Sequence, residues 1–158
     1  MSLAYIALGA NLGDPAATLE AAFAALGELP ASQLLRRSSL YRTAPIGLTA
    51  QPDFINAAAA LATDLPPLAL LDALQAIEQA FGRQRGVHNG PRTLDLDLLL
   101  YDARQIVTPR LNLPHPRLHL RAFVLQPLSE IAPDLALPGR GSVAAWLPAA
   151  ASPRSVRL

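Results

Sequence analysis

The sequence contains no cysteine and no lysine among its 158 residues, and charged residues make up only 16% of it. Without cysteine it has no disulfide framework, no thiolate nucleophile and no zinc–cysteine site. Without lysine it lacks the phosphate-binding lysine of Walker A loops and protein kinases, and it cannot form a lysine Schiff base. Any bound anion must therefore be held by guanidinium groups, which supply all 13 basic side chains, or by backbone N–H groups.

Long apolar runs and a strong net charge are also missing. No apolar run reaches the roughly 18 residues of a membrane-spanning helix, and a net charge of +1 argues against generic nucleic-acid binding. Residues 1–14 have no basic start and only a short apolar run, which argues against a signal peptide. Because 51% of the residues are apolar, the chain can bury a core. We expect one cytoplasmic domain spanning residues 1–158.

The order of the apolar patterns predicts the fold. A buried strand at 3–11 precedes Asp14 and Pro15, which suit the N-cap and first position of a helix that continues to Leu29. Residues 54–65 are rich in alanine, but their position between two turn-rich loops favours a strand over a helix. The β-α-β-β-α-β order is typical of the ferredoxin-like α+β fold, an antiparallel sheet with two helices on one face, here with a C-terminal extension. The other predicted elements are strands over 33–43 and 93–101 and helices over 66–82, over 123–133 and around Trp146.

Two carboxylates interrupt the leucine-rich strand TLDLDLLLY (93–101). A strand's period of two places Asp95 and Asp97 on one face and the alternate leucines from Leu94 to Leu100 on the other. Like charges this close repel each other unless a cation lies between them, and Mg²⁺ often combines one or two carboxylates with substrate phosphates. The pair therefore indicates a metal platform. The solvated outer face of an edge strand is the alternative that the spacing leaves open.

Arginines surround this strand in the sequence. Arg83, Arg85 and Arg92 flank the glycine-containing loop that precedes it, and Arg110 and Arg121 follow it. Guanidinium groups beside a magnesium platform would neutralise and clamp a polyphosphate. A single arginine of this kind is usually a solvated surface residue, but five around one acidic strand favour a polyphosphate site.

Other polar positions are weaker signals when taken alone. Gln75 and Glu78 share a helix face, as many exterior residues do. His115 lies between two prolines, where it could donate to a phosphate oxygen or simply stabilise a turn. Phe54 and Asn56 would face the same side of a strand, where the amide could read the edge of a heterocycle or be a satisfied core residue.

Seven segments resemble, in order, the family of 6-hydroxymethyl-7,8-dihydropterin pyrophosphokinases. This family has a ferredoxin-like core, uses two Mg²⁺ ions and transfers pyrophosphate from ATP to the hydroxymethyl group of the pterin, with release of AMP. The resemblance implies the same reaction of folate biosynthesis here, with ATP as co-substrate, in a monomer without nucleic-acid or membrane partners. The segments are AYIALGANLGD, SSLYRTAPIG, QPDFINAA, IEQAFGR, HNGPRTLDLDLLLYD, LPHPRL and RAFVLQPLSEIAPD, within residues 4–134.

The resemblance also implies roles for individual residues. Asp95 and Asp97 would hold both Mg²⁺ ions and form the catalytic set together with Arg83 and Arg92. The substrate hydroxyl would attack the β-phosphorus in line. The implied ATP contacts are Gln75, Glu78, Arg85, Leu98, Arg110, Asn112, His115 and Arg121. The implied pterin contacts are the backbone of Thr43, Ala44 and Ile46, the stacking rings of Phe54 and Phe123, and the amide of Asn56.

Three positions depart from the family pattern. Asn89 stands where some members have an aromatic residue, in a slightly shorter loop. Pro116 stands where some have tyrosine, and Asn112 where some have threonine. All three positions concern nucleotide affinity and loop closure rather than the reaction itself.

Two functions from other classes are alternatives. A metal-dependent phosphohydrolase would use the same carboxylates and arginines with water as the acceptor, and it would cleave ATP without a pterin. A ferredoxin-like RNA-binding module would need exposed aromatic residues on adjacent strands and a basic sheet face. The low aromatic content of 5% and the nearly neutral charge disfavour the second alternative.

Overall fold

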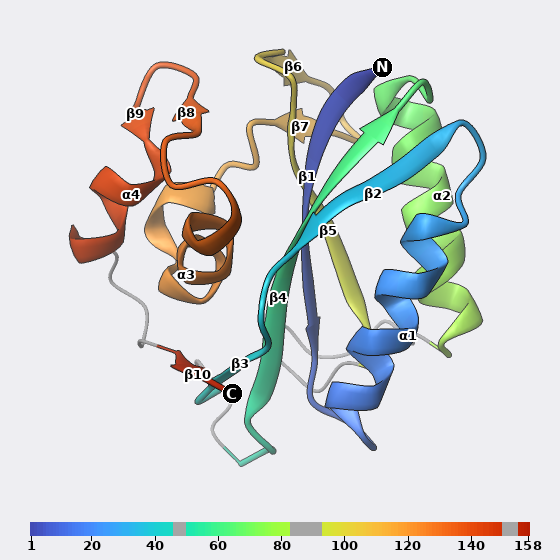
Figure 1. The fold of residues 1–158 in the computed structure, drawn as a ribbon, viewed down its shortest axis with the longest axis vertical. Helices are drawn as coiled ribbons and strands as arrows, with labels where there is room; N and C mark the ends of the chain where they lie inside the picture. The colour runs from blue at the N-terminus through green and yellow to red at the C-terminus, as the bar shows by residue number, and fades with distance from the viewer. Residues whose placement is uncertain (46–49, 83–92, 150–154) are drawn as a thin grey trace.

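The computed structural model describes residues 1–45, 50–82, 93–149 and 155–158. In these ranges six strands form one sheet, with helices against both of its faces (Figure 1). Among the helices described, none combines the length and the apolar character that a membrane span requires.

The chain follows the predicted β-α-β-β-α-β order and then continues through shorter elements. The first part comprises β1 (Ser2–Ala10), α1 (Pro15–Gly27), β2 (Ser32–Arg37), β3 (Tyr41–Thr43), β4 (Phe54–Thr63), α2 (Pro67–Ala80) and β5 (Asp95–Tyr101). The rest comprises β6 (Ile106–Val107), β7 (Asn112–Leu113), η1 (Leu118–Leu120), α3 (Ala122–Ile131), β8 (Ala136–Leu137), β9 (Gly141–Ser142), α4 (Val143–Trp146), η2 (Leu147–Ala149) and β10 (Val156–Arg157).

The sheet has the strand order β10-β3-β4-β1-β5, and β2 also pairs with β4. Each of these pairings is antiparallel, with β1 between β4 and β5. Because β2 and β3 lie along successive parts of β4, together they take the place of one edge strand of a ferredoxin-like sheet. The predicted fold class is therefore confirmed, and β10 adds a further strand outside β3.

The predicted strand over 33–43 is wrong as a continuous element. Strand β2 ends at Arg37 and β3 begins at Tyr41, and the register with β4 changes across the gap. Within the gap, the Ser38 backbone N–H donates to the Ala58 carbonyl at 2.9 Å, and the Ser38 hydroxyl oxygen accepts from the Ala58 N–H at 2.8 Å. A side chain thus completes the pairing where the strand bulges, and periodicity alone does not reveal such a bulge.

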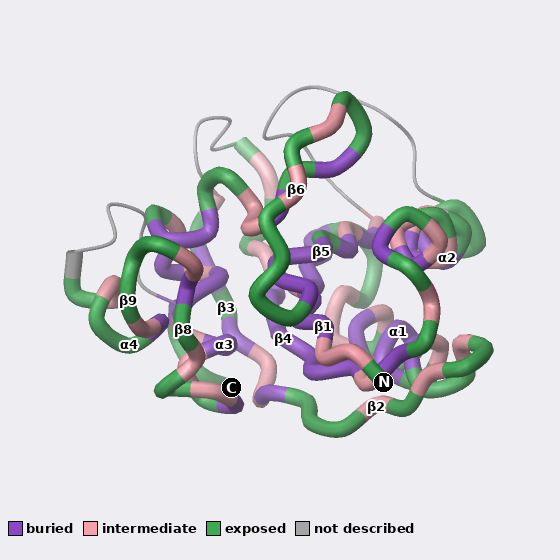
Figure 2. The backbone as a smooth tube through the Cα atoms, turned by 90° about the horizontal axis from the view of Figure 1, so that it is seen from above, coloured by how far each residue is buried: buried purple, intermediate pink, exposed green. Residues whose placement is uncertain are grey.

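Two apolar cores lie on opposite faces of the sheet. Figure 2 shows buried backbone along the central strands and along the helices that pack on them. Helices α1 and α2 cover one face, as predicted, and α3 covers the other (Figure 1). Strand β1 shows the division clearly, because Ile6 and Leu8 enter the core under α1 and α2 whereas Tyr5 enters the core under α3. Burial on both faces explains why β1 and β4 are apolar along most of their length.

The leucines of β5 share one face only over part of the strand. Leu96 and Leu98 pack in the core under α1 and α2, as predicted. The register with β1 then shifts between Leu98 and Leu100, and Leu100 packs in the core under α3. The predicted common face from Leu94 to Leu100 is therefore wrong beyond Leu98, because a bulge turns the strand.

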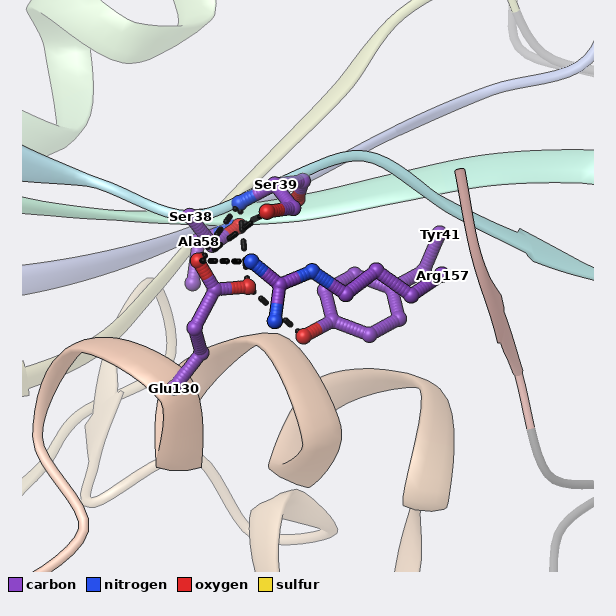
Figure 3. Close-up of polar contacts among 6 residues, drawn as sticks. All are labelled: Ser38, Ser39, Tyr41, Ala58, Glu130 and Arg157. Carbon is purple, nitrogen blue, oxygen red and sulfur yellow. Dashed lines mark hydrogen bonds and ion pairs between the residues drawn. The ribbon is translucent and has the colours of Figure 1, made fainter.

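Helix α3 is tied to the β3 side of the sheet through Glu130 (Figure 3). Its carboxylate accepts hydrogen bonds from the Ser39 backbone N–H at 3.0 Å, the Ser39 hydroxyl at 3.1 Å and the Tyr41 hydroxyl at 2.6 Å. The Arg157 guanidinium of β10 lies 3.7 Å from the same carboxylate. One side chain thus joins α3 to the bulge after β2, to β3 and to the C-terminal strand.

The hydrogen bonds around Glu130 depend on pH through the protonation of two groups, the Tyr41 hydroxyl and the Glu130 carboxylate. Burial, together with the hydrogen bond to Glu130 and its charge, raises the pKa of Tyr41 to about 12, so its hydroxyl remains a donor at neutral pH. Desolvation alone would raise the pKa of Glu130, but hydrogen bonds from Tyr41 and Ser39 and the charge of Arg157 outweigh it and lower that pKa. The stabilisation that the ionised Glu130 gives the folded state is therefore present above the ordinary carboxyl pKa. It is lost as the pH falls through the lowered pKa of Glu130.

We expect Tyr41→Phe to lower the free energy of unfolding at pH 7 by roughly 1–3 kcal/mol, because a charged acceptor loses a largely buried donor. Denaturant unfolding at pH 7 and at a series of lower pH values measures this cost, which should shrink as the pH falls through the lowered pKa of Glu130. Tyr101→Phe is the matched control, since it removes a 2.6 Å bond to the neutral Leu65 carbonyl. Equal pH dependence in the two variants would contradict the role of the Glu130 charge.

Candidate active site

One row of paired residues crosses the sheet at its β5 edge. Asp95 of β5 is paired with Gly9 of β1, and Gly9 is paired on its other side with Asn56 of β4. Directly paired residues of antiparallel strands point to the same face, so Asp95 and Asn56 both lie on the α3 side of the sheet. With strands about 4.8 Å apart, their backbones are separated by roughly 10 Å.

Small residues occupy the sheet between the acidic pair and Asn56. Gly9 lies between Asp95 and Asn56, and in the parallel row Ala7 is paired with both Asp97 and Ala58. A Cβ atom added at Gly9 would lie only 2.9 Å from Asn56 Oδ1. Glycine therefore allows the Asn56 amide to lie directly against β1.

The two carboxylates of β5 share a face, as predicted. Asp95 is half-buried and Asp97 is exposed. Between them, the Leu96 backbone N–H points away from β1 and donates to Glu78 Oε2 of α2 at 2.9 Å. Since Glu78 is only 4% exposed, this contact holds the edge strand where the carboxylates emerge. The ATP contact implied for Glu78 by the resemblance stays a prediction.

His115 and Arg121 lie within the electrostatic influence of Asp97. Burial lowers the pKa of His115; Asp97 opposes this change, whereas Arg121 and Arg117 add to it. Burial likewise lowers the pKa of Arg121, and Asp97 again opposes the change. The arrangement is therefore a carboxylate with a neutral imidazole and a cationic guanidinium nearby.

The His115 ring has a defined hydrogen-bonding direction. Its backbone N–H donates to the Leu99 carbonyl at 2.9 Å, which anchors the segment to β5. The Arg117 backbone N–H donates to Nδ1 of the ring at 3.3 Å. With Nδ1 as the acceptor, the neutral ring carries its hydrogen on Nε2 and can donate it to an anion.

A pocket of about 210 Å³ opens beside Asp97. On its rim, the Arg110 guanidinium lies 2.5 Å from Asp72 Oδ1 and 3.5 Å from Gln75 Oε1, both on α2. The structure thus brings together most of the described residues that the resemblance implies for ATP. The pocket is lined by Leu71, Leu96, Asp97, Leu98, Arg110, Leu111, Asn112, His115 and Pro116.

The residues implied for the pterin also come together, on β3, β4 and α3. Thr43 is paired with Phe54, and Asn56 Nδ2 donates to Thr43 Oγ1 at 3.0 Å. Phe123, in the first turn of α3, packs against the core on the same face of the sheet, and the Arg121 guanidinium lies 5.6 Å from its ring centre. Ala44 follows β3 directly and is exposed.

Several predicted site residues lie outside the described residues, and their roles stay predictions. They are Ile46, Arg83, Arg85 and Arg92, together with the departure at Asn89.

Sequence reasoning missed some residues that position the site. The Asn11 amide, 2% exposed, donates to Gln51 Oε1 at 2.9 Å and to the Pro52 carbonyl at 3.0 Å, which holds the approach to β4 against the end of β1. The predicted strand over 3–11 contains Gly9 but assigns it no separate role. A glycine inside an otherwise apolar strand is a signal of close approach that could have identified it.

A carboxylate pair beside a histidine and an arginine, on the edge of a ferredoxin-like sheet, is an arrangement suited to an enzyme that handles phosphate groups with a divalent cation. The chain belongs to the 7,8-dihydro-6-hydroxymethylpterin-pyrophosphokinase (HPPK) family, whose sequence model matches residues 5–133.

Relatives from several bacteria share about half of their residues with this chain. The 2-amino-4-hydroxy-6-hydroxymethyldihydropteridine pyrophosphokinase of Pseudomonas aeruginosa is 52% identical over 134 residues, which are 85% of this chain and 83% of that protein. The enzyme of the same name from Haemophilus influenzae is 50% identical over 138 residues, 87% of this chain and 86% of that protein. That of Bacillus subtilis is 46% identical over 130 residues, 82% and 78% of the two chains.

Solved structures show the same fold at low sequence identity. A crystal structure of HPPK-DHPS in complex with substrates has a TM-score of 0.71 and 14% identity, covering 94% of this chain and 43% of that one. Plasmodium falciparum HPPK-DHPS with pteroate has a TM-score of 0.75 and 13% identity, covering 94% and 42% of the two chains. This chain thus spans less than half the length of these structures.

We expect the pKa of His115 to lie below the ordinary 6.5 in protein free of Mg²⁺ and nucleotide. Asp97→Asn should lower it further, because the Asp97 charge opposes the effect of burial. An NMR titration of the histidine ring protons measures both values. His119 provides an internal reference, because its pKa is lowered by burial and by Arg140 and should not respond to the change at Asp97. A His115 pKa that rises in the variant would contradict this electrostatic assignment.

Proposed function

We propose that Asp95 and Asp97 mark the catalytic centre of a pyrophosphokinase, with ATP beside β5 and the pterin beside β4. The chain transfers pyrophosphate from ATP to the hydroxymethyl group of 6-hydroxymethyl-7,8-dihydropterin in folate biosynthesis, in keeping with its family and its relatives. The row Asp95–Gly9–Asn56 supports the assignment, because Asp95 and the Asn56 amide lie on one face of the sheet.

The donor set at the sheet edge suits Mg²⁺. In the part of the chain that the structure describes, no group of three or more histidine or carboxylate side chains could enclose a metal ion. Two carboxylates on one strand face are enough for Mg²⁺, which completes its octahedron with water and substrate phosphate oxygens. We therefore propose that Asp95 and Asp97 hold Mg²⁺, as two ions because the resemblance implies two. Bound there, the ions would offset the negative charge of the phosphates.

On the nucleotide side, His115 and Arg121 complement the acidic pair. The neutral His115 ring can donate from Nε2 to a phosphate oxygen, and Arg121 supplies positive charge beside Asp97. Ligand pockets usually have volumes of about 300–1,000 Å³, so the 210 Å³ pocket would enclose only part of ATP. We assign the further phosphate clamps to Arg83 and Arg92 and a nucleotide contact to Arg85, as the resemblance implies.

On the pterin side, the chain provides two aromatic rings and an oriented amide. Phe54 and Phe123 would stack on the heterocycle while Asn56 reads its edge. The substrate hydroxyl oxygen then forms a bond to the β-phosphorus, and the bond from that phosphorus to the oxygen shared with the α-phosphate breaks. AMP leaves and the hydroxyl proton is released. The protein's part is to align the two substrates and offset charge.

We further propose that one copy of the chain suffices for activity. The resemblance to the family supports this proposal, because it implies a monomer. The cytoplasmic location stays a prediction of the sequence.

The test is nucleotide analysis after mixing the protein with ATP, Mg²⁺ and the pterin. We expect AMP and a pterin diphosphate in equal amounts, and a loss of roughly 100–1,000-fold in turnover for Asp97→Asn without loss of folding, because Asp97 is exposed. The exposed Asp134→Asn serves as the control that keeps activity. Formation of ADP, or ATP cleavage without the pterin, would favour a different transferase or the phosphohydrolase.

We expect Gly9→Ala to raise the KM for the pterin roughly tenfold, because the new Cβ would displace the Asn56 amide. Steady-state kinetics with each substrate varied in turn measures this change. Gly27→Ala is the matched control: its Cβ would lie at an ordinary 3.8 Å from Leu34. An unchanged KM for the pterin in Gly9→Ala would argue against Asn56 as a pterin contact.

A further inference from the structure

The C-terminal residues lie beyond the family match, which ends at residue 133, yet they reach the proposed pterin site. Strand β10 pairs with β3 through Val156 opposite Arg42 and Arg157 opposite Tyr41. The Leu158 backbone N–H continues the pairing with a 2.9 Å bond to the Leu40 carbonyl. The end of the chain thus runs along the outer side of β3 (Figure 1).

Ser155 begins this segment and is buried against the site. Its hydroxyl forms a hydrogen bond with the Thr43 hydroxyl, and Thr43 Oγ1 accepts from Asn56 Nδ2 at 3.0 Å. The three residues are exposed by 9%, 3% and 7% respectively, so water cannot readily replace these bonds. A hydroxyl has one hydrogen and two lone pairs. Because Asn56 and Ser155 both engage the Thr43 hydroxyl, it cannot rotate without losing a bond.

Helix α3 holds Ser155 in place through Gln126. The Ser155 backbone N–H donates to Gln126 Oε1 at 2.6 Å, and Gln126 Nε2 donates to the Ser155 carbonyl at 3.1 Å. Gln126 lies three residues after Phe123, so it shares a face of α3 with the proposed stacking ring. The same helix therefore carries the ring and clamps the serine.

We propose that Ser155 is a positioning residue for pterin recognition, acting through Thr43 on the Asn56 amide. A carboxamide can turn over and exchange its donor and acceptor, and only one of these orientations complements a given ring edge. When the Thr43 hydroxyl gives its only hydrogen to the Ser155 hydroxyl, it can only accept from Asn56, which selects the orientation in which Nδ2 points to Thr43. This inference rests on the proposed role of Asn56 as a pterin contact.

The test compares the KM for the pterin with the KM for ATP in the full-length protein. We expect Ser155→Ala to raise the KM for the pterin about threefold to tenfold, as befits one lost hydrogen bond, and to leave the KM for ATP within about twofold. Val156→Ala is the matched control, because its side chain is 56% exposed and its pairing with β3 runs through the backbone. This control should keep both constants.

A double-mutant cycle tests the route through Thr43. If Ser155 acts through that hydroxyl, Ser155→Ala added to Thr43→Val should raise the KM for the pterin no further. Additive effects would overturn the proposal. Equal rises in both KM values would also overturn it, since they would indicate a general structural defect.

An Asn56→Ala variant separates this inference from the proposed function. If Asn56→Ala leaves the KM for the pterin unchanged, the assigned pterin site is wrong and the inference falls with it. If Asn56→Ala raises that constant but Ser155→Ala does not, the site stands and only the role of Ser155 is refuted.

Discussion

The pairing of β1 with β4 on one side and with β5 on the other is the constraint on which the rest of the structure depends. It sets Asp95, Gly9 and Asn56 in one row across three strands. Because paired antiparallel residues share a face, the acidic pair and the amide must lie on the same side of the sheet. Their separation follows from strand spacing, so residues far apart in the sequence meet with little freedom to move.

Helix α3 covers this face of the sheet and completes the candidate site there. It buries the second core while presenting Phe123 at its first turn, and Glu130 ties its other end to Tyr41 and Arg157 (Figure 3). A helix packed in the core and tied to the sheet by Glu130 holds an aromatic ring more precisely than a loop would, which suits recognition of a flat heterocycle. Gln126 extends the same support to the C-terminal strand.

The described part of the site has few charged side chains. Asp97 faces a histidine that burial keeps neutral and an arginine whose own pKa is lowered. A cation between the carboxylates and an anion beside the guanidinium would complement each other, because each carries a charge opposite to that of the side chains next to it. Glu78, by contrast, has a structural contact, since its carboxylate accepts from the backbone of β5.

The sequence by itself determined the order of the elements and the common face of Asp95 and Asp97, because periodicity and capping are local properties. The resemblance predicted which segments form the site. Only the tertiary structure decided the breaks in periodicity at Ser38 and before Leu100, where distant strands impose a bulge. It alone placed Ser155 against Thr43, because that contact joins residues separated by most of the chain and no local pattern encodes it.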